Sequence, residues 1–304
     1  MRCPTAAGRP APGASARRMA GVLFACLAGV FFGGLNITMR RGLDRVRDVG
    51  AASAVIASVG LVVVGAAAAA LARGSADLTA LWPFFLLGVA VPGLSQLAVV
   101  RAVRAAGASR AGILFGMAPL FSALIAIAAF DEPLRWPLVV GTLLIVAGGV
   151  ALAWERERPL EYRAYGAFLA VAVAVLFGLR DNAARSAGEA VNADPLAQST
   201  AIMLGATLVL ALNLLRQGDA PARARRALAP FAPSGVLAAL AQLTLFEALD
   251  RAPVTVVAPL AGTGVLWTVV FAAIFLGKSE LVGRRLLVVA LLVLAGGALV
   301  AATR

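Results

Sequence analysis

Histidine is absent from the sequence, and cysteine occurs only twice, at Cys3 and Cys26. Two cysteines cannot form a disulfide framework, and the chain lacks the ligands that metal sites usually need. Integral membrane metalloproteases and most other metal-dependent membrane enzymes require such ligands, so we expect neither a metal nor a cofactor. The missing histidine also argues against a membrane-embedded enzyme, which needs convergent acid, base or nucleophilic groups.

Charged residues are scarce as well, at 14% of the 304 residues, whereas 61% are hydrophobic and the mean hydropathy is +0.92. A soluble protein of this length presents polar side chains over most of its surface, so we predict an integral membrane protein. The net charge of +12 comes from arginines that lie mostly in short connections and at both termini. Basic segments beside transmembrane helices normally contact lipid headgroups and set topology. We therefore expect membrane lipids as partners, and no nucleic acid.

Long apolar runs bounded by charges are the candidate transmembrane helices. A bilayer core of about 30 Å is crossed by about 20 helical residues. Trp82, Trp136 and Trp154 fall at the ends of such runs, where their rings favour the membrane interface. The predicted fold class is an all-α integral membrane protein with ten transmembrane helices, at residues 20–38, 50–72, 81–100, 109–130, 136–154, 164–184, 195–215, 231–250, 254–276 and 282–302.

The first 18 residues differ from the rest, because they are rich in proline, alanine, glycine and arginine. We predict a disordered tail over residues 1–18. Arg17 and Arg18 precede an apolar run, as in a signal peptide, but no small-x-small cleavage site follows before Arg40. We interpret this run as an uncleaved first helix, with Met19 as a candidate true start.

The sequence also repeats itself. Gly93–Ala105 aligns with Ala239–Arg251 at a shift of 146 residues, and Gln96 then matches Gln242 although the chain contains only four glutamines. At a shift of 145 residues, the first predicted helix aligns with the sixth, and Asn36 matches Asp181 there. Two halves follow, at residues 19–155 and 160–304, with five helices each. Because five is odd, the second half enters the membrane from the opposite side, and inverted repeats of this kind are typical of secondary transporters.

The polar triplet Arg180-Asp181-Asn182 ends an apolar run over residues 164–179, which makes only about 24 Å of helix. Such a helix either thins the bilayer or carries Arg180 and Asp181 into its last turns, where an unpaired charge is costly. The triplet is therefore either a helix end that reaches the headgroups or the mouth of a substrate cavity, and we favour the cavity mouth.

Further polar residues suggest a gate and a binding site. Glu247 matches Arg101 in the repeat, so the two are either a gate or coupling pair across the halves, together with Arg180, or charges at helix ends. Asp181 and Glu247 are the nearest candidates for proton coupling. Gln96 and Gln242 lie deeper, where each amide needs a partner in a medium without water. Interhelical hydrogen bonding and substrate contact both meet that need.

Four more residues stand inside predicted helices. Trp267 falls in the middle of one, where it either packs against a neighbouring helix or forms a wall of a substrate cavity. Pro92, Pro119 and Pro259 each remove a backbone hydrogen bond, which permits bending, lines a cavity or leaves a static kink. We predict that one common space between the halves is lined by Asn36, Gln96, Asp181, Gln242 and Trp267.

These features together resemble the EamA-like branch of the drug/metabolite transporter superfamily. The resemblance is clearest in FFGGLNITMRR, at the end of the first predicted helix, and in Ala118–Leu152, where Glu132 stands in the family's Leu-Gly-Glu turn. In the second half, Phe275–Val300 keeps the Leu-Gly but has Lys278 where the glutamate is expected, with Glu280 two residues later. These motifs are hydrophobic and diffuse, so they specify the fold and not the substrate.

The resemblance implies ten helices in two inverted repeats. It also implies a permease of the bacterial inner membrane that moves a small metabolite or an amphipathic compound, often outward, by alternating access, as a monomer or homodimer. The alternatives are a non-transporting assembly or sensor protein and a flippase for a lipid-linked substrate. The family places both termini in the cytoplasm, and we keep that orientation as the expectation. Counted on that basis, however, Lys and Arg number 10 inside and 17 outside, and the positive-inside rule favours the reverse.

Overall fold

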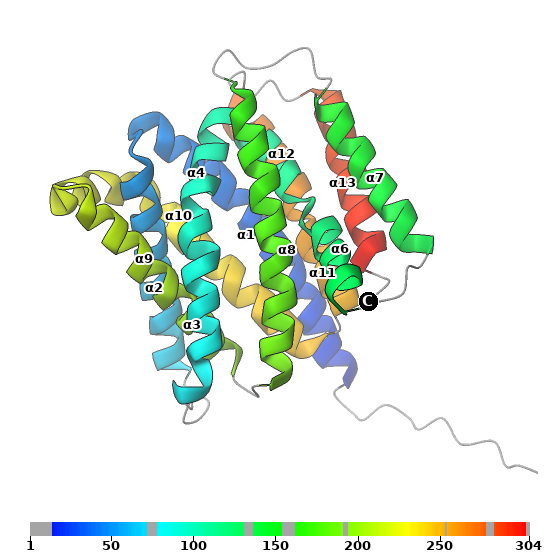
Figure 1. The fold of residues 1–304 in the computed structure, drawn as a ribbon, viewed down its shortest axis with the longest axis horizontal. Helices are drawn as coiled ribbons and strands as arrows, with labels where there is room; N and C mark the ends of the chain where they lie inside the picture. The colour runs from blue at the N-terminus through cyan, green and yellow to red at the C-terminus, as the bar shows by residue number, and fades with distance from the viewer. Residues whose placement is uncertain are drawn as a thin grey trace, which may run out of the picture.

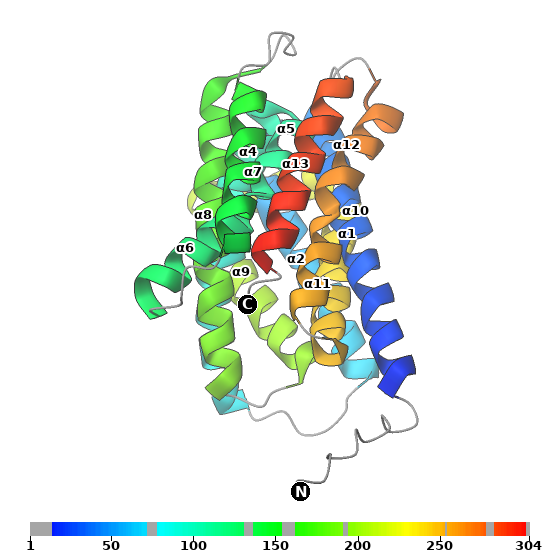
Figure 2. The same ribbon diagram turned by 90° about the vertical axis from the view of Figure 1, so that its right-hand side faces the viewer.

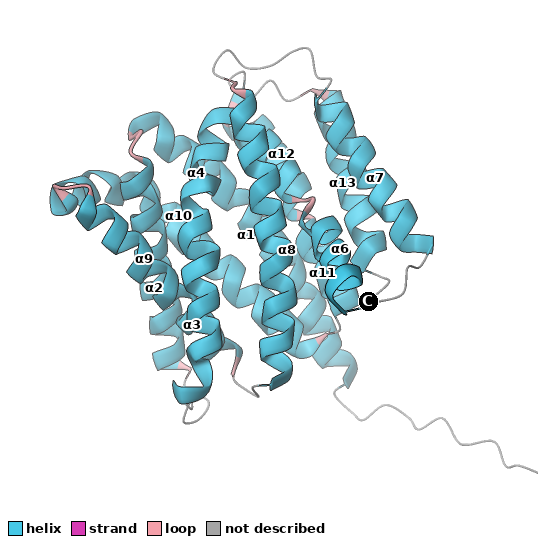
Figure 3. Ribbon diagram, in the orientation of Figure 1, coloured by secondary structure: helices cyan, strands magenta, loops and turns pink. Residues whose placement is uncertain are grey.

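The protein is almost entirely helical in the computed structural model (Figure 1), which describes residues 14–71, 78–130, 136–153, 162–190, 194–252, 254–277 and 283–301. Figure 3 shows helices and short connections within these ranges, and no strand. The helices of the first half are α1 (Ala14–Arg45), α2 (Val49–Ala70), η1 (Leu78–Leu81), α3 (Trp82–Gly88), η2 (Val89–Leu94), α4 (Ser95–Ala106), α5 (Ala108–Phe115), α6 (Ala118–Phe130) and α7 (Trp136–Ala153). Those of the second half are α8 (Ala164–Ala190), α9 (Pro195–Arg216), α10 (Ala220–Arg251), α11 (Val254–Gly262), α12 (Gly264–Phe275) and α13 (Arg284–Ala301).

Five of these helical segments are long and apolar enough to cross a membrane: Arg17–Arg45, Val49–Ala70, Trp82–Ala106, Leu196–Arg216 and Ala220–Arg251. Three further apolar stretches are shorter, at Val139–Leu152, Ala164–Arg180 and Leu260–Phe275. The fourth and ninth predicted spans are each divided into two helices, α5 with α6 and α11 with α12. A multi-pass membrane protein follows from this pattern.

The start of α1 differs from the prediction of a disordered tail over residues 1–18. The helix begins at Ala14, so the last residues of that tail are helical, while residues 1–13 lie outside the described ranges. Alanine and arginine are good helix formers, and Arg17 pairs with Asp250 at 3.2 Å, which ties this turn to the end of α10.

Helices α1 and α8, which open the two halves, run in opposite directions. Arg40, near the end of α1, donates from Nη1 to the Arg104 carbonyl at 3.1 Å. The backbone amide of Arg163, just before α8, donates to the carbonyl of Ala105, the residue after Arg104, at 2.7 Å. α1 therefore ends where α8 begins, as Figures 1 and 2 show. We call this end of the bundle the Arg104 end, and the other, where α1 begins beside Asp250, the Asp250 end.

The two halves pack against each other reciprocally. α1 contacts α10, α11 and α12, while α8 contacts α3, α4, α5 and α6. In the same way α2 packs on α10, and α9 packs on α3 and η2. α2 also contacts α9, and α7 contacts α13. Equivalent helices of the two halves thus have equivalent neighbours. For example, α1 packs on α10 to α12, and its counterpart α8 packs on the corresponding helices α3 to α6. This is the packing of a two-repeat architecture.

Glycine makes the closest of these contacts possible on both sides. A Cβ added at Gly33 of α1 would lie 2.5 Å from the Trp267 Cβ and 2.9 Å from the Thr268 amide nitrogen. A Cβ added at Gly178 of α8 would lie 2.7 Å from the Ser122 amide nitrogen. Small residues let membrane helices approach closely, and here they do so at equivalent places, between α1 and α12 and between α8 and α6.

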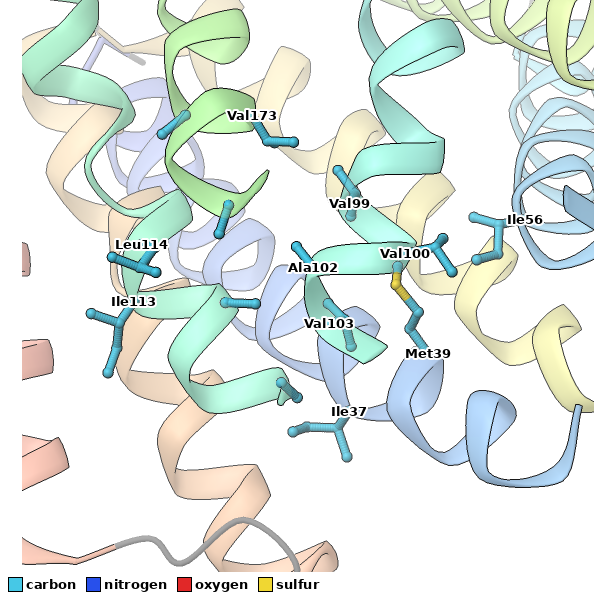
Figure 4. Close-up of a cluster of buried hydrophobic side chains, with 14 of the residues drawn as sticks. Ile37, Met39, Ile56, Val99, Val100, Ala102, Val103, Ile113, Leu114 and Val173 are labelled. Atoms are coloured by element: carbon cyan, nitrogen blue, oxygen red, sulfur yellow. The ribbon is translucent and has the colours of Figure 1, made fainter. Parts of the chain in front are cut away.

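The interior and the outer surface are both apolar. Figure 4 shows the main buried cluster, which joins side chains of α1, α2, α4, α5 and α8, among them Ile37, Ile56, Val100, Ile113 and Val173. Large apolar side chains are also exposed, for example Leu23 at 61%, Val62 at 69%, Phe168 at 74% and Ile274 at 65%. In water such a surface would promote association, whereas lipid chains solvate it without cost.

Candidate functional site

Asn36 of α1 forms a hydrogen bond to the other half of the protein. Its Nδ2 donates to Thr268 Oγ1 of α12 at 3.1 Å, and that hydroxyl donates to the Gly264 carbonyl at 2.8 Å. Thr268 is fully buried, while Asn36 is half-buried. Gly33, one turn earlier in α1, brings the two helices close enough for this contact. We call the hydrogen bond between Asn36 and Thr268 the Asn36 bond.

Asn182 of α8 forms the corresponding hydrogen bond, with the donor in the second half and the acceptor in the first half. Its Nδ2 lies 2.9 Å from the Ser122 carbonyl oxygen and 3.1 Å from Ser122 Oγ in α6, and 2.9 Å from the Gly178 carbonyl oxygen. Asn182 is only 5% exposed. We call its contact with Ser122 the Asn182 bond. The amide of Asn36 thus has its counterpart in Asn182, whereas the side chain of Asp181, the predicted partner, lies outside the described residues.

The sequence contained a signal for these residues that the prediction did not use. Asn36 and Asn182 are 146 residues apart, as are Ser122 and Thr268, and this is the shift that relates Gln96 to Gln242. The shift of 145 that was used for the first helix matches Gly33 to Gly178, and the structure gives these two glycines equivalent contacts. The glycines therefore match at a shift of 145 residues and the asparagines at a shift of 146. As a result, the glycine and the asparagine are three residues apart in α1 and four apart in α8. Both spacings keep the two residues on one face of the helix.

Arg180 lies inside α8, which continues to Ala190. Its guanidinium carbon is 5.1 Å from the centre of the Phe177 ring, and that ring lies 6.1 Å from the ring of Phe115 at the end of α5. Arg180 is half-buried. A guanidinium over an aromatic face is stabilised by the ring quadrupole, and more so where water is excluded.

Gln96 and Gln242 are both half-buried, in α4 and α10. Among the described residues neither side-chain amide has a hydrogen-bond partner. Gln96 stands in the first turn of α4, directly after the π-helix η2. Each amide can therefore still donate and accept hydrogen bonds.

Trp267 lies on the exposed side of α12. Its side chain is 37% exposed, as is Val270, and Ile274 one further turn along is 65% exposed. The ring stacks on Phe271 with centroids 5.4 Å apart, and Phe271 in turn lies 6.0 Å from Phe275. The backbone and Cβ of Trp267 face α1, at Gly33.

The predicted gate pair of Arg101 and Glu247 is not formed in this structure. Glu247 binds Arg251 of its own helix, and Arg251 lies over the ring of Phe24, near the start of α1. Arg101 is exposed in α4, one turn before Arg104 and at the opposite end of the bundle. Both charges lie near helix ends, which is the alternative reading, because antiparallel repeats exchange the two ends and bring together only equivalent residues near the middle.

All three predicted helix breaks stand at or beside interruptions. Pro92 is inside the π-helix η2, where Val91 has non-helical φ and ψ of −142° and 112°. Pro119 is the second residue of α6, just after the break between α5 and α6. Pro259 lies in α11, three residues before that helix ends at Gly262. A proline at the start of a helix costs no hydrogen bond, so Pro92 and Pro259 are the two that remove one.

An ion pair also joins the halves at the Arg104 end. Arg223 of α10 donates from Nε and Nη2 to the two carboxylate oxygens of Asp48 at 2.6 and 2.7 Å, and from Nη2 to Gln217 Oε1 at 2.7 Å. Asp48 also caps α2 by accepting from the Ala51 amide at 3.0 Å. The hydrogen bond from Arg223 holds the pKa of the Asp48 carboxyl below its ordinary value, with the Ala51 amide adding to the effect.

Comparison with known proteins fits this two-part packing. The profile of the EamA-like transporter family matches the chain twice, over residues 19–154 and again over residues 164–302. The chain belongs to the EamA-like transporter family. No curated protein sequence matches this EamA-like chain. A crystal structure of another protein superposes on it with a TM-score of 0.59, covering 92% of this chain and 96% of the other at 18% identity, which shows a shared fold.

Proposed function

We propose that this EamA-like protein is a secondary transporter with ten transmembrane segments in two inverted repeats, and that it moves a small metabolite or amphipathic compound by alternating access. The membrane is the bacterial inner membrane in this proposal. The observation that carries it is the reciprocal packing of antiparallel halves, in which α1 meets α10 to α12 and α8 meets α3 to α6. Transporters with inverted repeats bind their substrate between the halves and expose it by moving one repeat against the other.

The available polar groups support a substrate recognised by hydrogen bonds. Gln96 and Gln242 each present an uncommitted amide within an otherwise apolar segment. Interrupted helices, which transporters use near their sites, occur at η2, between α5 and α6 and between α11 and α12. Because both amides can donate and accept, the proposed substrate carries neutral polar groups such as hydroxyls or amides.

The first test is ligand-dependent thermal stability of the purified protein, screened against amino acids, nucleosides, sugars and cationic amphiphiles. A ligand that binds the folded state raises the melting temperature. We expect a hit whose shift is lost in Gln96→Ala and Gln242→Ala and kept in Thr142→Ala, a polar change in α7 away from these helices. Counterflow of the same compound in proteoliposomes then tests transport. A hit that binds but is never exchanged would favour a sensor and contradict the proposal.

A further inference from the structure

Two equivalent seams of the protein each contain an asparagine hydrogen bond between the halves, and the seam of α1 with α12 also contains a hydrogen bond from Arg41 Nη2 to the Phe275 carbonyl at 3.1 Å. The seam of α1 with α12 contains the Asn36 bond, and the seam of α8 with α6 contains the Asn182 bond. In both seams a glycine of the first helix, Gly33 or Gly178, lies against the residue that receives the amide. The same arrangement of a close glycine and an asparagine hydrogen bond therefore occurs twice, once with the donor in the first half and once with the donor in the second half.

The two bonds lie toward opposite ends of the bundle. Asn36 is one turn before Arg40, which binds the carbonyl of Arg104, so the Asn36 bond lies about 6 Å along α1 from Arg40, on the side of the Arg104 end. Asn182 stands far along α8, roughly 27 Å of helix after its first residue, Ala164. Since α8 begins at the Arg104 end, the Asn182 bond lies toward the Asp250 end. One of the two bonds thus lies toward each end of the bundle.

The surroundings give each bond a reason to stay closed. In the hydrocarbon region an amide that loses its partner finds no water, and the desolvated group raises the free energy. Either bond can therefore open only when water or a polar solute reaches its end of the protein. The two also differ in their surroundings: Asn36 is half-buried with one acceptor, whereas buried Asn182 has three acceptor atoms within 3.1 Å.

We infer that these two contacts are the gate bonds of the transporter. The Asn36 bond opens when the protein opens at the Arg104 end, and the Asn182 bond opens when it opens at the Asp250 end. The structure, with both bonds formed, is the state closed on both sides. This inference rests on the proposed function, because gates have a meaning only in a protein that opens alternately. It also assigns roles to Asn182, Ser122 and Thr268, positioning residues that act by holding helices together.

Hydrogen–deuterium exchange of the full-length protein in phospholipid nanodiscs tests the inference without knowledge of the substrate. In Asn36→Ala we expect amide exchange to rise roughly three- to fivefold at the end of α1 and in α12, as the loss of one hydrogen bond implies. The Asp250 end should not change. In Asn182→Ala the increase should appear in α6 and the last turns of α8, and not at the Arg104 end.

Two further variants keep the test decisive. Thr268→Val removes the hydroxyl at constant shape. It should raise exchange at the same segments as Asn36→Ala, and the double variant should exchange no faster than either single variant. Ser234→Ala is the matched control, because Ser234 Oγ donates to Thr38 Oγ1 at 3.0 Å and so joins α10 to α1 by a bond of the same kind. It should leave exchange in α12 unchanged. If Asn182→Ala does not fold, Ser122→Ala takes its place; it removes the hydroxyl contact and leaves the carbonyl contact, so it should raise exchange at the same segments by a smaller factor.

The outcomes separate the gates from the function. Opening of the same end by both asparagine variants, or of α12 by Ser234→Ala, would overturn the gate assignment even if a solute is transported. End-specific opening supports the gate bonds. If it is found while no solute exchanges in proteoliposomes, the proposed transport fails and the two contacts remain only conformational switches.

Discussion

Arg223 and Asp48 join the two halves at the Arg104 end through a bidentate ion pair, with nitrogen–oxygen distances of 2.6 and 2.7 Å. Both side chains are about one quarter exposed, at 23% and 26%. A two-pronged contact of this geometry is stronger than an ordinary surface ion pair. It links the cap of α2 to the start of α10, and it predicts a pH-dependent contribution to stability.

Replacing Arg223 by alanine should lower the free energy of unfolding by about 1 kcal/mol at pH 7. The pKa of Asp48 is lower in the folded protein than in the unfolded chain, so the stabilisation is present above the unfolded value of about 3.9. It is lost as the pH falls through the folded pKa, where the carboxylate becomes protonated. The melting temperatures of wild type and Arg223→Ala should therefore differ at pH 7 and converge below pH of about 4.

Arg226→Ala is the matched control for that measurement, since Arg226 is an exposed arginine one turn further along α10. It should melt like the wild type at every pH. Asp48→Asn should keep the side-chain cap of α2 while losing the charge, so its melting temperature should fall less than that of Asp48→Ala. A gap between wild type and Arg223→Ala that stays constant down to pH of about 3 would refute the ion-pair explanation.

The seam of α1 with α12 predicts a sharp difference between two glycines. Gly33→Ala places a methyl group 2.5 Å from the Trp267 Cβ, and the nearby Thr268 backbone cannot yield as a flexible side chain can. Overpacking of this kind costs about 1–3 kcal/mol. Gly65 of α2 has nothing within 4 Å of the same methyl position. Gly65→Ala should therefore melt at or above the wild-type temperature, because alanine favours helix, while Gly33→Ala melts lower. Equal effects of the two changes would show that the close approach is unimportant.

The sequence predicted the arrangement of helices in two halves because that arrangement depends on patterns that extend over many residues, namely the internal repeat and the long apolar runs. The match of Gln96 to Gln242 and of Gly33 to Gly178 identified the two halves, and the helices of the two halves do pack reciprocally. Apolar runs located the helices for the same reason, since a bilayer requires about 20 such residues.

The site was harder to predict because it depends on single positions. Successive residues of a helix point about 100° apart. A run of consecutive polar residues therefore does not tell whether Asp181 or Asn182 faces the other half. The match of Ser122 to Thr268 at a shift of 146 residues is a weak signal by itself, because serine and threonine in helices commonly bond to their own backbone. Arg101 and Glu247 were paired on the assumption that equivalent residues meet, which the antiparallel arrangement excludes away from the middle.

Trp267 should face lipid. It shares the exposed side of α12 with Val270 and Ile274, at positions three and seven residues apart, where helical neighbours align. In a variant that keeps only this tryptophan, brominated lipid chains should quench its fluorescence, while a water-soluble quencher such as iodide should have little effect. A tryptophan at Phe84, which is buried, provides the control that neither quencher reaches. Strong iodide quenching would instead return Trp267 to a water-filled cavity, as first predicted.

Charge is distributed unequally between the two ends of the bundle, and this predicts the orientation in the membrane. The described arginines of the Arg104 end are Arg40, Arg41, Arg45, Arg47, Arg101, Arg104, Arg110, Arg163, Arg216, Arg223, Arg225, Arg226, Arg284 and Arg285, and the described acidic side chains there are Asp44, Asp48 and Asp219. The corresponding residues toward the Asp250 end are Arg17, Arg18, Arg180 and Arg251, with Asp194, Glu247 and Asp250. Positive residues flanking membrane helices are retained in the cytoplasm, so we predict that the Arg104 end is cytoplasmic. The family's orientation would place it outside.

Reporter fusions at the C-terminus decide between these orientations, because α13 runs from the Arg104 end toward the Asp250 end (Figure 2). Alkaline phosphatase, which is active only outside the cytoplasm, should be active there, and green fluorescent protein, which is fluorescent only inside, should be dark. The exposed arginines 45, 225, 226 and 284 have no side-chain partner among the described residues. Changing these four to glutamine should therefore leave the fold intact and shift part of the population to the reverse orientation. A fluorescent wild-type fusion would show that the family's topology prevails over the charge distribution.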